Sequence, residues 1–144
     1  MLSTSHCFIT WKDAMPLEFS KAQHHLYLDF LGDIGQRWLQ VFEGNTEFYS
    51  AAYWDLLKEI WRNEEPVRKT DALGFMTNVK SPHTAGKYID ATISYGFVIE
   101  RENPEDARSK LLELSPDMRA KLDEFFDQVI KELLVTARKI EPND

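Results

Sequence analysis

One stretch, residues 81–115, constrains the fold more than any other part of this chain. The pair Ser81-Pro82 is typical of a helix start, because serine caps a helix and proline suits the first helical position. Gly96 is suited to end that helix, since glycine readily takes the left-handed conformation found there. Two short β-prone runs follow, at 97–99 and 111–114, around a polar loop. A helix that leads directly into a two-stranded hairpin predicts a winged helix.

The composition is that of an ordinary globular domain. The 144 residues suit one domain with its own core. The formal net charge of −7 argues against a coat of basic residues for nonspecific nucleic-acid binding. Cys7 is the only cysteine, which excludes an intrachain disulfide and favours a reducing compartment. We find no apolar run of the ~20 residues needed to cross a bilayer and no signal peptide, so we expect a cytoplasmic protein.

Apolar residues recur at helical spacing over most of the chain. The pattern predicts helices over 17–42, 47–63, 68–76, 81–95 and 115–140. Gly32 and Gly35 are candidates to kink or split the first of them, because each costs about 1 kcal/mol relative to alanine. The N-terminal residues Phe8, Ile9 and Trp11 are too apolar for a free tail, so part of this arm is expected to pack. The predicted fold class is mainly α with a small β-hairpin wing.

The first and last helices carry wider apolar stripes than a lone domain needs. We therefore expect a single domain with an N-terminal arm and dimerisation helix (1–45), a winged helix-turn-helix lobe (46–114) and a C-terminal dimerisation helix (115–144). The expected dimer contacts are Phe19, Leu26, Phe30, Phe126, Ile130 and Leu134.

Four motifs resemble the MarR (multiple antibiotic resistance regulator) family of winged helix-turn-helix transcriptional regulators. Residues 84–90 (TAGKYID) resemble its recognition helix, and residues 96–98 (GFV) resemble the entry to its wing. Residues 103–110 (NPEDARSK) are similar to its Asp-x-Arg wing signature, and 114–116 (LSP) to the start of its next helix. The wing signature is the most specific of the four, and the whole resemblance covers roughly residues 17–140.

The resemblance implies a homodimeric repressor that binds duplex DNA. One helix of each subunit would enter the major groove, and the wing would reach the minor groove. Arg108 would be the minor-groove arginine, and Asp106 would orient either its guanidinium or the wing turn. The expected DNA contacts are Arg68, Lys69, Lys80, Ser81, His83, Thr84, Lys87, Tyr88, Arg101, Arg108 and Lys110.

The chain also departs from the family pattern. Lys87 stands where the family usually has arginine, and the two are not equivalent at bidentate sites. Thr92 stands where a core leucine is expected. The wing is acidic, and many family members continue with one more helix after the long C-terminal one. The acidic net charge and the Glu-rich wing favour an alternative of another class, a winged-helix protein-interaction module without DNA binding.

Aromatic residues offer a candidate effector site. A wide set of aromatic residues forms either the core or the lining of a cavity between the dimer helices and the lobe, where the resemblance implies that effectors such as aromatic acids bind. The set is Trp38, Phe42, Tyr49, Tyr53, Trp54 and Trp61, of which Trp38, Phe42, Tyr53 and Trp54 are the candidate pocket residues. The expected ligand is a small aromatic or apolar molecule.

The remaining histidine, cysteine and acidic residues do not indicate a cofactor site, a metal site or a catalytic site. His24, His25 and Asp29 are a weak metal candidate, because adjacent histidines point to different sides of a helix. Cys7 is a weak redox candidate, because no basic residue is closer than His6. The chain contains no nucleophile elbow, phosphate loop or dinucleotide motif, so we do not expect an enzyme.

Overall fold

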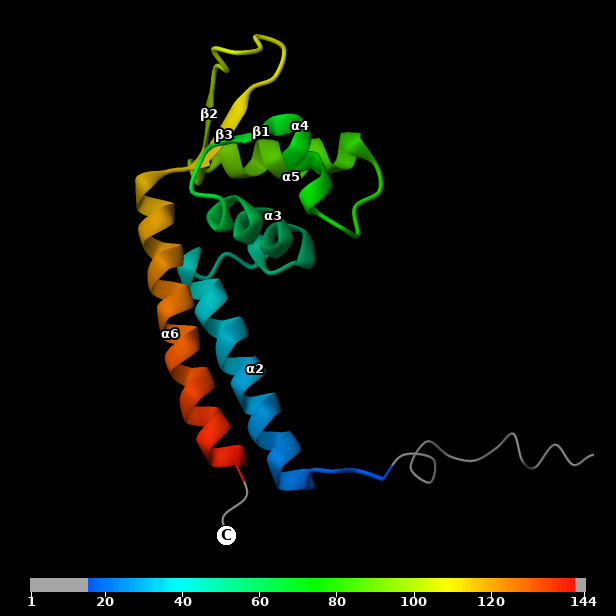
Figure 1. The fold of residues 1–144 in the computed structure, drawn as a ribbon, viewed down its shortest axis with the longest axis vertical. Helices are drawn as coiled ribbons and strands as arrows, with labels where there is room; N and C mark the ends of the chain where they lie inside the picture. Colours follow the sequence, from blue (N-terminus) through cyan, green and yellow to red (C-terminus); the bar gives the residue numbers. More distant parts are fainter. Residues whose placement is uncertain (1–15, 142–144) are drawn as a thin grey trace, which may run out of the picture.

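The computed structural model describes residues 16–141 and is mainly helical, with a small sheet (Figure 1). The predictions for His6, Cys7, Phe8, Ile9 and Trp11 concern residues outside this range. The elements are α2 (Lys21–Val41), η2 (Thr46–Phe48), α3 (Ala51–Arg62), β1 (Val67–Arg68), α4 (Lys69–Ala72), η3 (Leu73–Phe75), α5 (Pro82–Ser94), β2 (Val98–Arg101), β3 (Leu111–Leu114) and α6 (Pro116–Ile140). No helix among them is long and apolar enough to cross a membrane.

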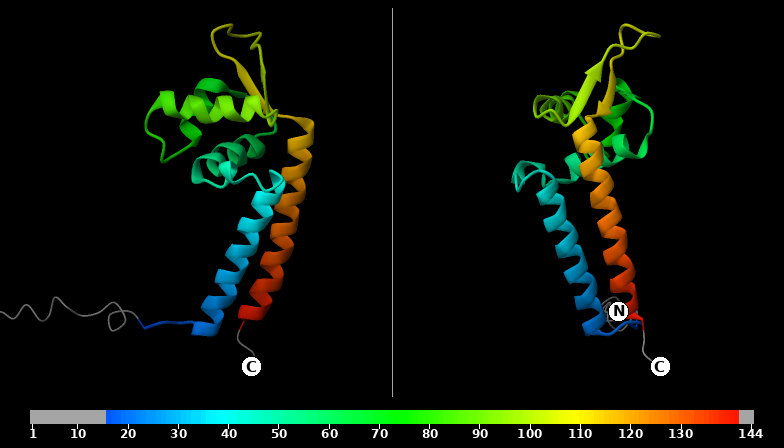
Figure 2. Two further views of the ribbon diagram at one scale, coloured as in Figure 1. Left: turned by 180° about the vertical axis from the view of Figure 1, so that it is seen from behind. Right: turned by 90° about the vertical axis from the view of Figure 1, so that its left-hand side faces the viewer.

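The two longest helices, α2 and α6, lie side by side in all three views and form a stalk (Figures 1 and 2). A capping box between Ser20 and Gln23 starts α2. The Gln23 side-chain amide also donates to the Ile140 carbonyl at 2.6 Å, which joins the start of α2 to the end of α6. The helix runs unbroken through Gly32 and Gly35, so these glycines do not split it. Packing on α6 offsets the modest cost of two glycines.

The connection from α2 to α3 is longer than the periodicity predicts. Gly44 ends α2 with φ +82°, and the next helix begins at Ala51 with Ser50 as its N-cap rather than at residue 47. A short 3-10 turn lies between the two helices. Within it Phe48 is fully buried, and its carbonyl accepts a 2.8 Å bond from the Trp38 indole. Burial of Phe48 therefore anchors the connection to the stalk.

The elements from η2 to β3 lie at one end of the stalk, and we call them the lobe; they include a three-stranded antiparallel sheet (Figure 1). The predicted hairpin is confirmed: β2 pairs with β3, with Val98 opposite Leu114. A third strand, β1, was not predicted; it pairs with β3 through Val67 and Arg68. Two residues are too short to give a periodic signal, and their partner is distant in sequence.

Helix α5 has the predicted start and stop signals. The Ser81 hydroxyl accepts from the Thr84 amide, Pro82 opens the first turn, and Gly96 follows the helix with φ +79°. Thr92 is fully buried, and its hydroxyl donates to the Ile89 carbonyl at 2.7 Å. A buried threonine is thus accommodated within the helix because its own backbone satisfies the hydroxyl.

An aromatic core joins the stalk to the lobe. Trp38 meets Phe42, Trp54 and Phe125 edge-on, with ring centroids 4.9–5.4 Å apart. Phe48 continues the cluster toward the sheet. Edge-to-face packing of this kind adds about 0.5–1.5 kcal/mol per pair beyond burial. The lobe is therefore packed directly on the upper half of the stalk.

Candidate nucleic-acid interface

The N-terminal half of α5 presents a polar, exposed surface. Ser81, His83, Thr84 and Lys87 are all exposed. Such residues bond phosphates and base edges, and the N-terminal end of the helix adds a favourable dipole. Tyr88 differs from them, because it is half-buried and its ring packs edge-on against Tyr53 at 5.0 Å. The Tyr88 ring therefore packs partly against the core, and it is less exposed than the other predicted contacts of α5.

The tip of the wing holds one very exposed arginine. The Arg108 side chain is 95% exposed, and its Nε lies 3.6 Å from Asp106 Oδ1. The same carboxylate oxygen accepts from the Arg108 backbone N–H at 3.0 Å. Asn103 makes the equivalent bond to the Glu105 N–H. The two Asx turns shape the wing, so Asp106 orders the backbone that carries Arg108.

Several other predicted contacts pair with carboxylates of the same lobe. Arg101 bonds Glu113, and Lys110 bonds Glu102. Arg68 lies 3.6 Å from Asp71, with both side chains exposed. Exposed pairs of this kind are weak, about 0–1 kcal/mol each. These cations can exchange a carboxylate for a phosphate, but the carboxylates lower the positive potential of the wing.

Lys69 is held more firmly than the other cations. Its ammonium lies 2.6 Å from Glu100 Oε2 and 3.5 Å from Asp90 Oδ1. The hydrogen bond to Glu100 is the main cause that raises the pKa of Lys69, and the charge of Asp90 adds to it. Its backbone N–H donates to the Lys110 carbonyl at 2.8 Å. Lys69 therefore joins α4, α5 and the wing.

Of the cations among the predicted DNA contacts, three remain available to a ligand outside the chain. Lys80 and Lys87 are exposed, and no carboxylate of residues 16–141 lies within 4.0 Å of either amine. Arg108 is the third, because its side chain is almost fully exposed, whereas that of Arg68, with a carboxylate contact of the same length, is only about 58% exposed. Lys80 and Lys87 flank the first turns of α5, and Arg108 lies at the tip of the wing.

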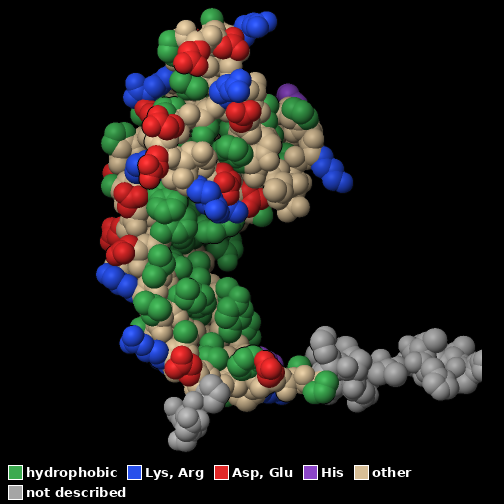
Figure 3. Space-filling model, in the orientation of Figure 1, with side chains coloured by type: hydrophobic (Ala, Val, Ile, Leu, Met, Phe, Trp, Pro, Cys, Tyr) green, Lys and Arg blue, Asp and Glu red, His purple; other side chains and the backbone are tan. Residues whose placement is uncertain are grey.

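The stalk carries most of the exposed apolar surface. Figure 3 shows hydrophobic side chains along the stalk and in the hollow beneath the lobe. Of the residues predicted for dimerisation, Phe19, Ile130 and Leu134 are exposed and Leu26 is half-buried. The other two pack within the chain: Phe30 is 8% exposed, and Phe126 lies 4.2 Å from the Trp61 ring. Further exposed apolar residues, not singled out from the sequence, are Tyr27, Leu28, Leu133 and Val135.

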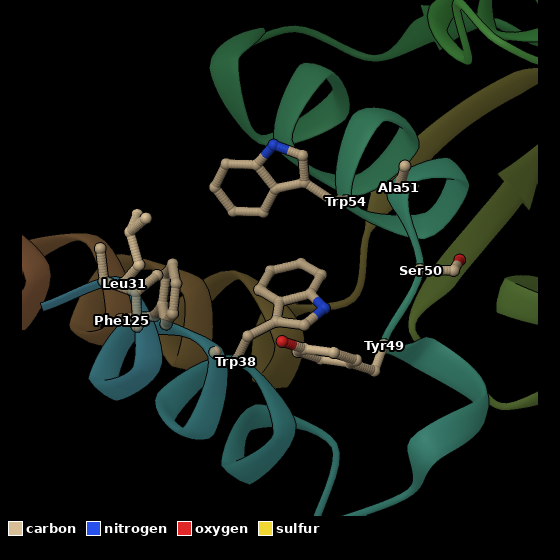
Figure 4. A pocket seen from close by; sticks show the side chains of 9 residues that line it. Leu31, Trp38, Tyr49, Ser50, Ala51, Trp54 and Phe125 are labelled. Carbon is tan, nitrogen blue, oxygen red and sulfur yellow. The ribbon is translucent and has the colours of Figure 1, made fainter. Parts of the chain in front are cut away.

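A pocket of about 350 Å³ lies where α2, α3 and α6 meet (Figure 4). Trp38 and Trp54 line it as predicted, whereas Phe42 and Tyr53 do not; both are buried in the core. Tyr49, a member of the wider aromatic set, also lines the pocket. The sequence did not indicate Leu31 and Phe125 as lining residues, although Leu31 shares the helical stripe of Trp38 and was identifiable by spacing.

Metal-binding geometry is not found in the described part of the chain, where no three His, Cys, Asp or Glu side chains gather around one point. The pair His24 and His25 is exposed on α2.

Comparison with known proteins gives structural matches only. No family model matches the chain, and no curated protein does. RV1404 from Mycobacterium tuberculosis is similar over 89% of this chain and 86% of its own, with a TM-score of 0.62 at 15% identity. The MarR family transcription regulator SP03579 is similar over 84% of this chain and 74% of its own, with a TM-score of 0.58 at 13% identity.

A third match was solved with nucleic acid. The transcriptional repressor CouR, bound to a 23-mer DNA duplex, is similar over 91% of this chain and 80% of its own, with a TM-score of 0.52 at 18% identity. The matches span the stalk as well as the lobe, so the likeness extends beyond a generic winged helix. The chain therefore has the winged helix-turn-helix fold of the MarR-family transcriptional regulators.

Proposed function

We propose that this chain is a DNA-binding transcriptional repressor that acts as a homodimer in the cytoplasm. Helix α5 of each subunit enters the major groove, and each wing contacts the minor groove of a pseudo-palindromic site. The observation that carries the proposal is that Lys80 and Lys87, near the start of α5, have no carboxylate partner among residues 16–141, while Arg108 at the tip of the wing is almost fully exposed.

The division of roles follows the architecture. The stalk helices α2 and α6 supply the dimer interface through their exposed apolar residues, and residues 46–114 supply the DNA-reading lobe. Two lobes related by a two-fold axis read half-sites about one helical turn apart. The similarity in fold to CouR, which was solved on duplex DNA, supports this arrangement.

Each proposed contact has a chemical role. Lys80 and Lys87 bind phosphates, which makes affinity fall steeply with salt as counterions are released. His83 and Thr84 donate to base edges from the exposed face of α5. Arg108 enters the minor groove, where the negative potential attracts a guanidinium.

The direct test is selection of bound duplexes from a random library, followed by anisotropy titration of the enriched sequence at several salt concentrations. We expect an enriched inverted repeat, bound at least a hundredfold more tightly than random duplex, with a clear salt dependence. Equal binding of enriched and random duplexes at low salt contradicts the proposal.

A second candidate function rests on the carboxylates of the lobe. Because Glu113, Glu102 and Glu100 neutralise Arg101, Lys110 and Lys69, a protein-interaction module that does not bind DNA has structural support. The same library selection separates the two functions, since an interaction module enriches no sequence.

The pocket beneath the lobe supports ligand control of the proposed repressor. Its walls come from both the stalk and α3, so an occupant would alter how the lobe sits on the stalk. A small aromatic or apolar effector that favours one lobe orientation would change DNA affinity by its differential affinity for the two states.

A further inference from the structure

A short turn connects the stalk to the far end of the lobe. Figure 1 shows α5 beyond α3 from the stalk, so the orientation of α5 depends on the segments that lie between them. The 3-10 turn η2 is one of these segments and follows α2 closely in the chain. Its residue Phe48 is fully buried, and the Phe48 carbonyl accepts a 2.8 Å hydrogen bond from the Trp38 indole of α2. The turn is therefore fixed to the stalk.

The residue before Phe48 is bonded to α5. Glu47 Oε1 accepts a hydrogen bond from the Tyr95 hydroxyl at 3.1 Å, and Tyr95 is the C-cap of α5. Glu47 Oε2 accepts from the Tyr53 hydroxyl at 3.3 Å, and Tyr53 is a buried residue of α3. Hydrogen bonds to an ionised carboxylate are stronger than bonds between neutral groups. One carboxylate thus joins the turn, α3 and the end of α5.

Aromatic packing supports the same arrangement. The Phe48 ring centroid lies 4.6 Å from that of Tyr53 and 5.0 Å from that of Tyr95. Tyr53 in turn meets Tyr88 of α5 edge-on, with the centroids 5.0 Å apart. Packed rings tolerate a range of offsets, whereas a hydrogen bond fixes the distance and direction between donor and acceptor. The two bonds to Glu47 therefore determine the angle at which α5 packs.

Glu47 acts at the end of α5 that is remote from the proposed base contacts. Within residues 16–141, the Tyr53 and Tyr95 phenols are the only side-chain groups hydrogen-bonded to its carboxylate. Tyr95 ends α5, whereas Ser81 caps its beginning. A change at Glu47 can therefore alter the orientation of α5 while leaving the proposed DNA contacts in place on the helix.

From these contacts we infer that Glu47 is a positioning residue that sets the angle between α5 and the stalk, and with it the preferred spacing of the two DNA half-sites. The inference rests on the proposed function and adds a determinant of spacing that does not touch DNA. In a two-fold dimer the two stalks define the axis, so a change in the angle of α5 in each subunit changes the separation of the two reading helices. The spacing of the half-sites follows from that separation.

The test uses a duplex library in which the two enriched half-sites are separated by a variable number of base pairs. Wild type should favour one spacing at least tenfold over spacings one base pair shorter or longer. Glu47→Ala should reduce this preference to less than threefold. It should also bind the best site three- to tenfold more weakly with an unchanged salt slope, because no phosphate contact is lost.

Two substitutions separate geometry from charge. Glu47→Gln removes the charge but keeps a carbonyl oxygen and an amide group that can bond both phenols, so it should retain most of the spacing preference. Glu124→Ala removes the same charge from an exposed position on α6 and should retain all of it. A loss of preference in Glu124→Ala equal to that in Glu47→Ala would assign the effect to net charge and overturn the inference.

Tyr95→Phe is the mildest variant, because it removes only the hydroxyl at the end of α5. It should broaden the spacing preference as Glu47→Ala does, and combining the two substitutions should add little. Amide hydrogen exchange of the DNA-free protein gives an independent measurement. Both single variants should exchange faster over residues 91–97, with unchanged exchange over residues 103–109 of the wing. Wild-type exchange at 91–97 in both variants contradicts the role of Glu47.

The library selection also separates this inference from the proposed function. If wild type enriches an inverted repeat and Glu47→Ala keeps the same sharp preference for one spacing, only the inference about Glu47 fails. If wild type enriches no duplex, the proposed repressor function fails, and the inference about spacing fails with it.

Discussion

The ammonium group of Lys69 lies 2.6 Å from the carboxylate of Glu100 and joins the start of α4 to strand β2. It also lies 3.5 Å from Asp90 on α5. One side chain thus connects the helix proposed to read the major groove with the wing proposed to reach the minor groove. We expect Lys69 to position these two elements relative to each other.

Replacing Lys69 by methionine tests this role. Because the side chain is occupied by carboxylates, Lys69→Met should weaken duplex binding three- to tenfold while leaving the salt dependence of log K unchanged. A phosphate contact would instead lower the salt slope by about one. Anisotropy titrations over a salt series make the distinction. Glu100→Gln should weaken binding similarly, and Lys69→Arg should restore most of the affinity.

The exposed cations should behave differently from Lys69. Lys87→Ala and Arg108→Ala should each weaken duplex binding by about 1–2 kcal/mol and lower the salt slope by about one. Lys131→Ala on the stalk removes the same charge far from the lobe, and it should leave both quantities unchanged. Wild-type affinity in both lobe variants, with folding intact by circular dichroism, contradicts the proposed interface.

The winged lobe was predictable because its signals are local. A serine cap, a proline in the first turn and a left-handed glycine each act within a few residues, so α5 and the start of α6 lie where the sequence places them. The candidate site was predicted on the same basis. His83, Thr84 and Lys87 are exposed because Ala85 and Ile89 take the buried face of the same helix.

The features that the sequence did not predict depend on contacts between residues far apart in the chain. Strand β1 forms because Val67 meets Leu112, a residue far along the chain. The pairing of Lys69 with Glu100 likewise requires the fold, since no local rule brings α4 to β2. The lining of the pocket differs from the prediction because it too depends on the fold. Tyr53 is buried in the core, and Tyr49 lines the pocket instead.

The exposed apolar surface of α6 should govern self-association. Leu134→Glu places a charge at a position that is more than half exposed in one chain and would be buried in the proposed dimer, where an unpaired charge is strongly unfavourable. We expect analytical ultracentrifugation to show a folded monomer with greatly weakened DNA binding. A dimeric Leu134→Glu would exclude this face from the interface.

The indole of Trp38 should contribute to stability through its hydrogen bond. Trp38→Phe leaves the buried Phe48 carbonyl without its 2.8 Å donor, which should cost about 1–3 kcal/mol beyond the lost ring volume. Trp61→Phe removes a bond of the same length to Asp123 at an exposed site, where water replaces the donor. Urea unfolding should therefore show a clearly larger loss for Trp38→Phe, and equal losses would contradict the role assigned to this bond.

Tyr53 should make the protein sensitive to alkaline pH. Burial, together with the charge of Glu47 and a 3.3 Å hydrogen bond to it, raises the pKa of the Tyr53 phenol from 10.0 to about 12. Between these values the unfolded chain releases a proton that the folded chain keeps, so the free energy of unfolding should fall by about 2 kcal/mol as pH rises. Urea unfolding at a series of pH values measures the fall. Tyr53→Phe should show a shallower decline than wild type, whereas Tyr27→Phe, at an exposed position on α2, should decline as wild type does. Identical slopes for Tyr53→Phe and wild type would mean that the phenol ionises as readily in the folded protein as in the unfolded one.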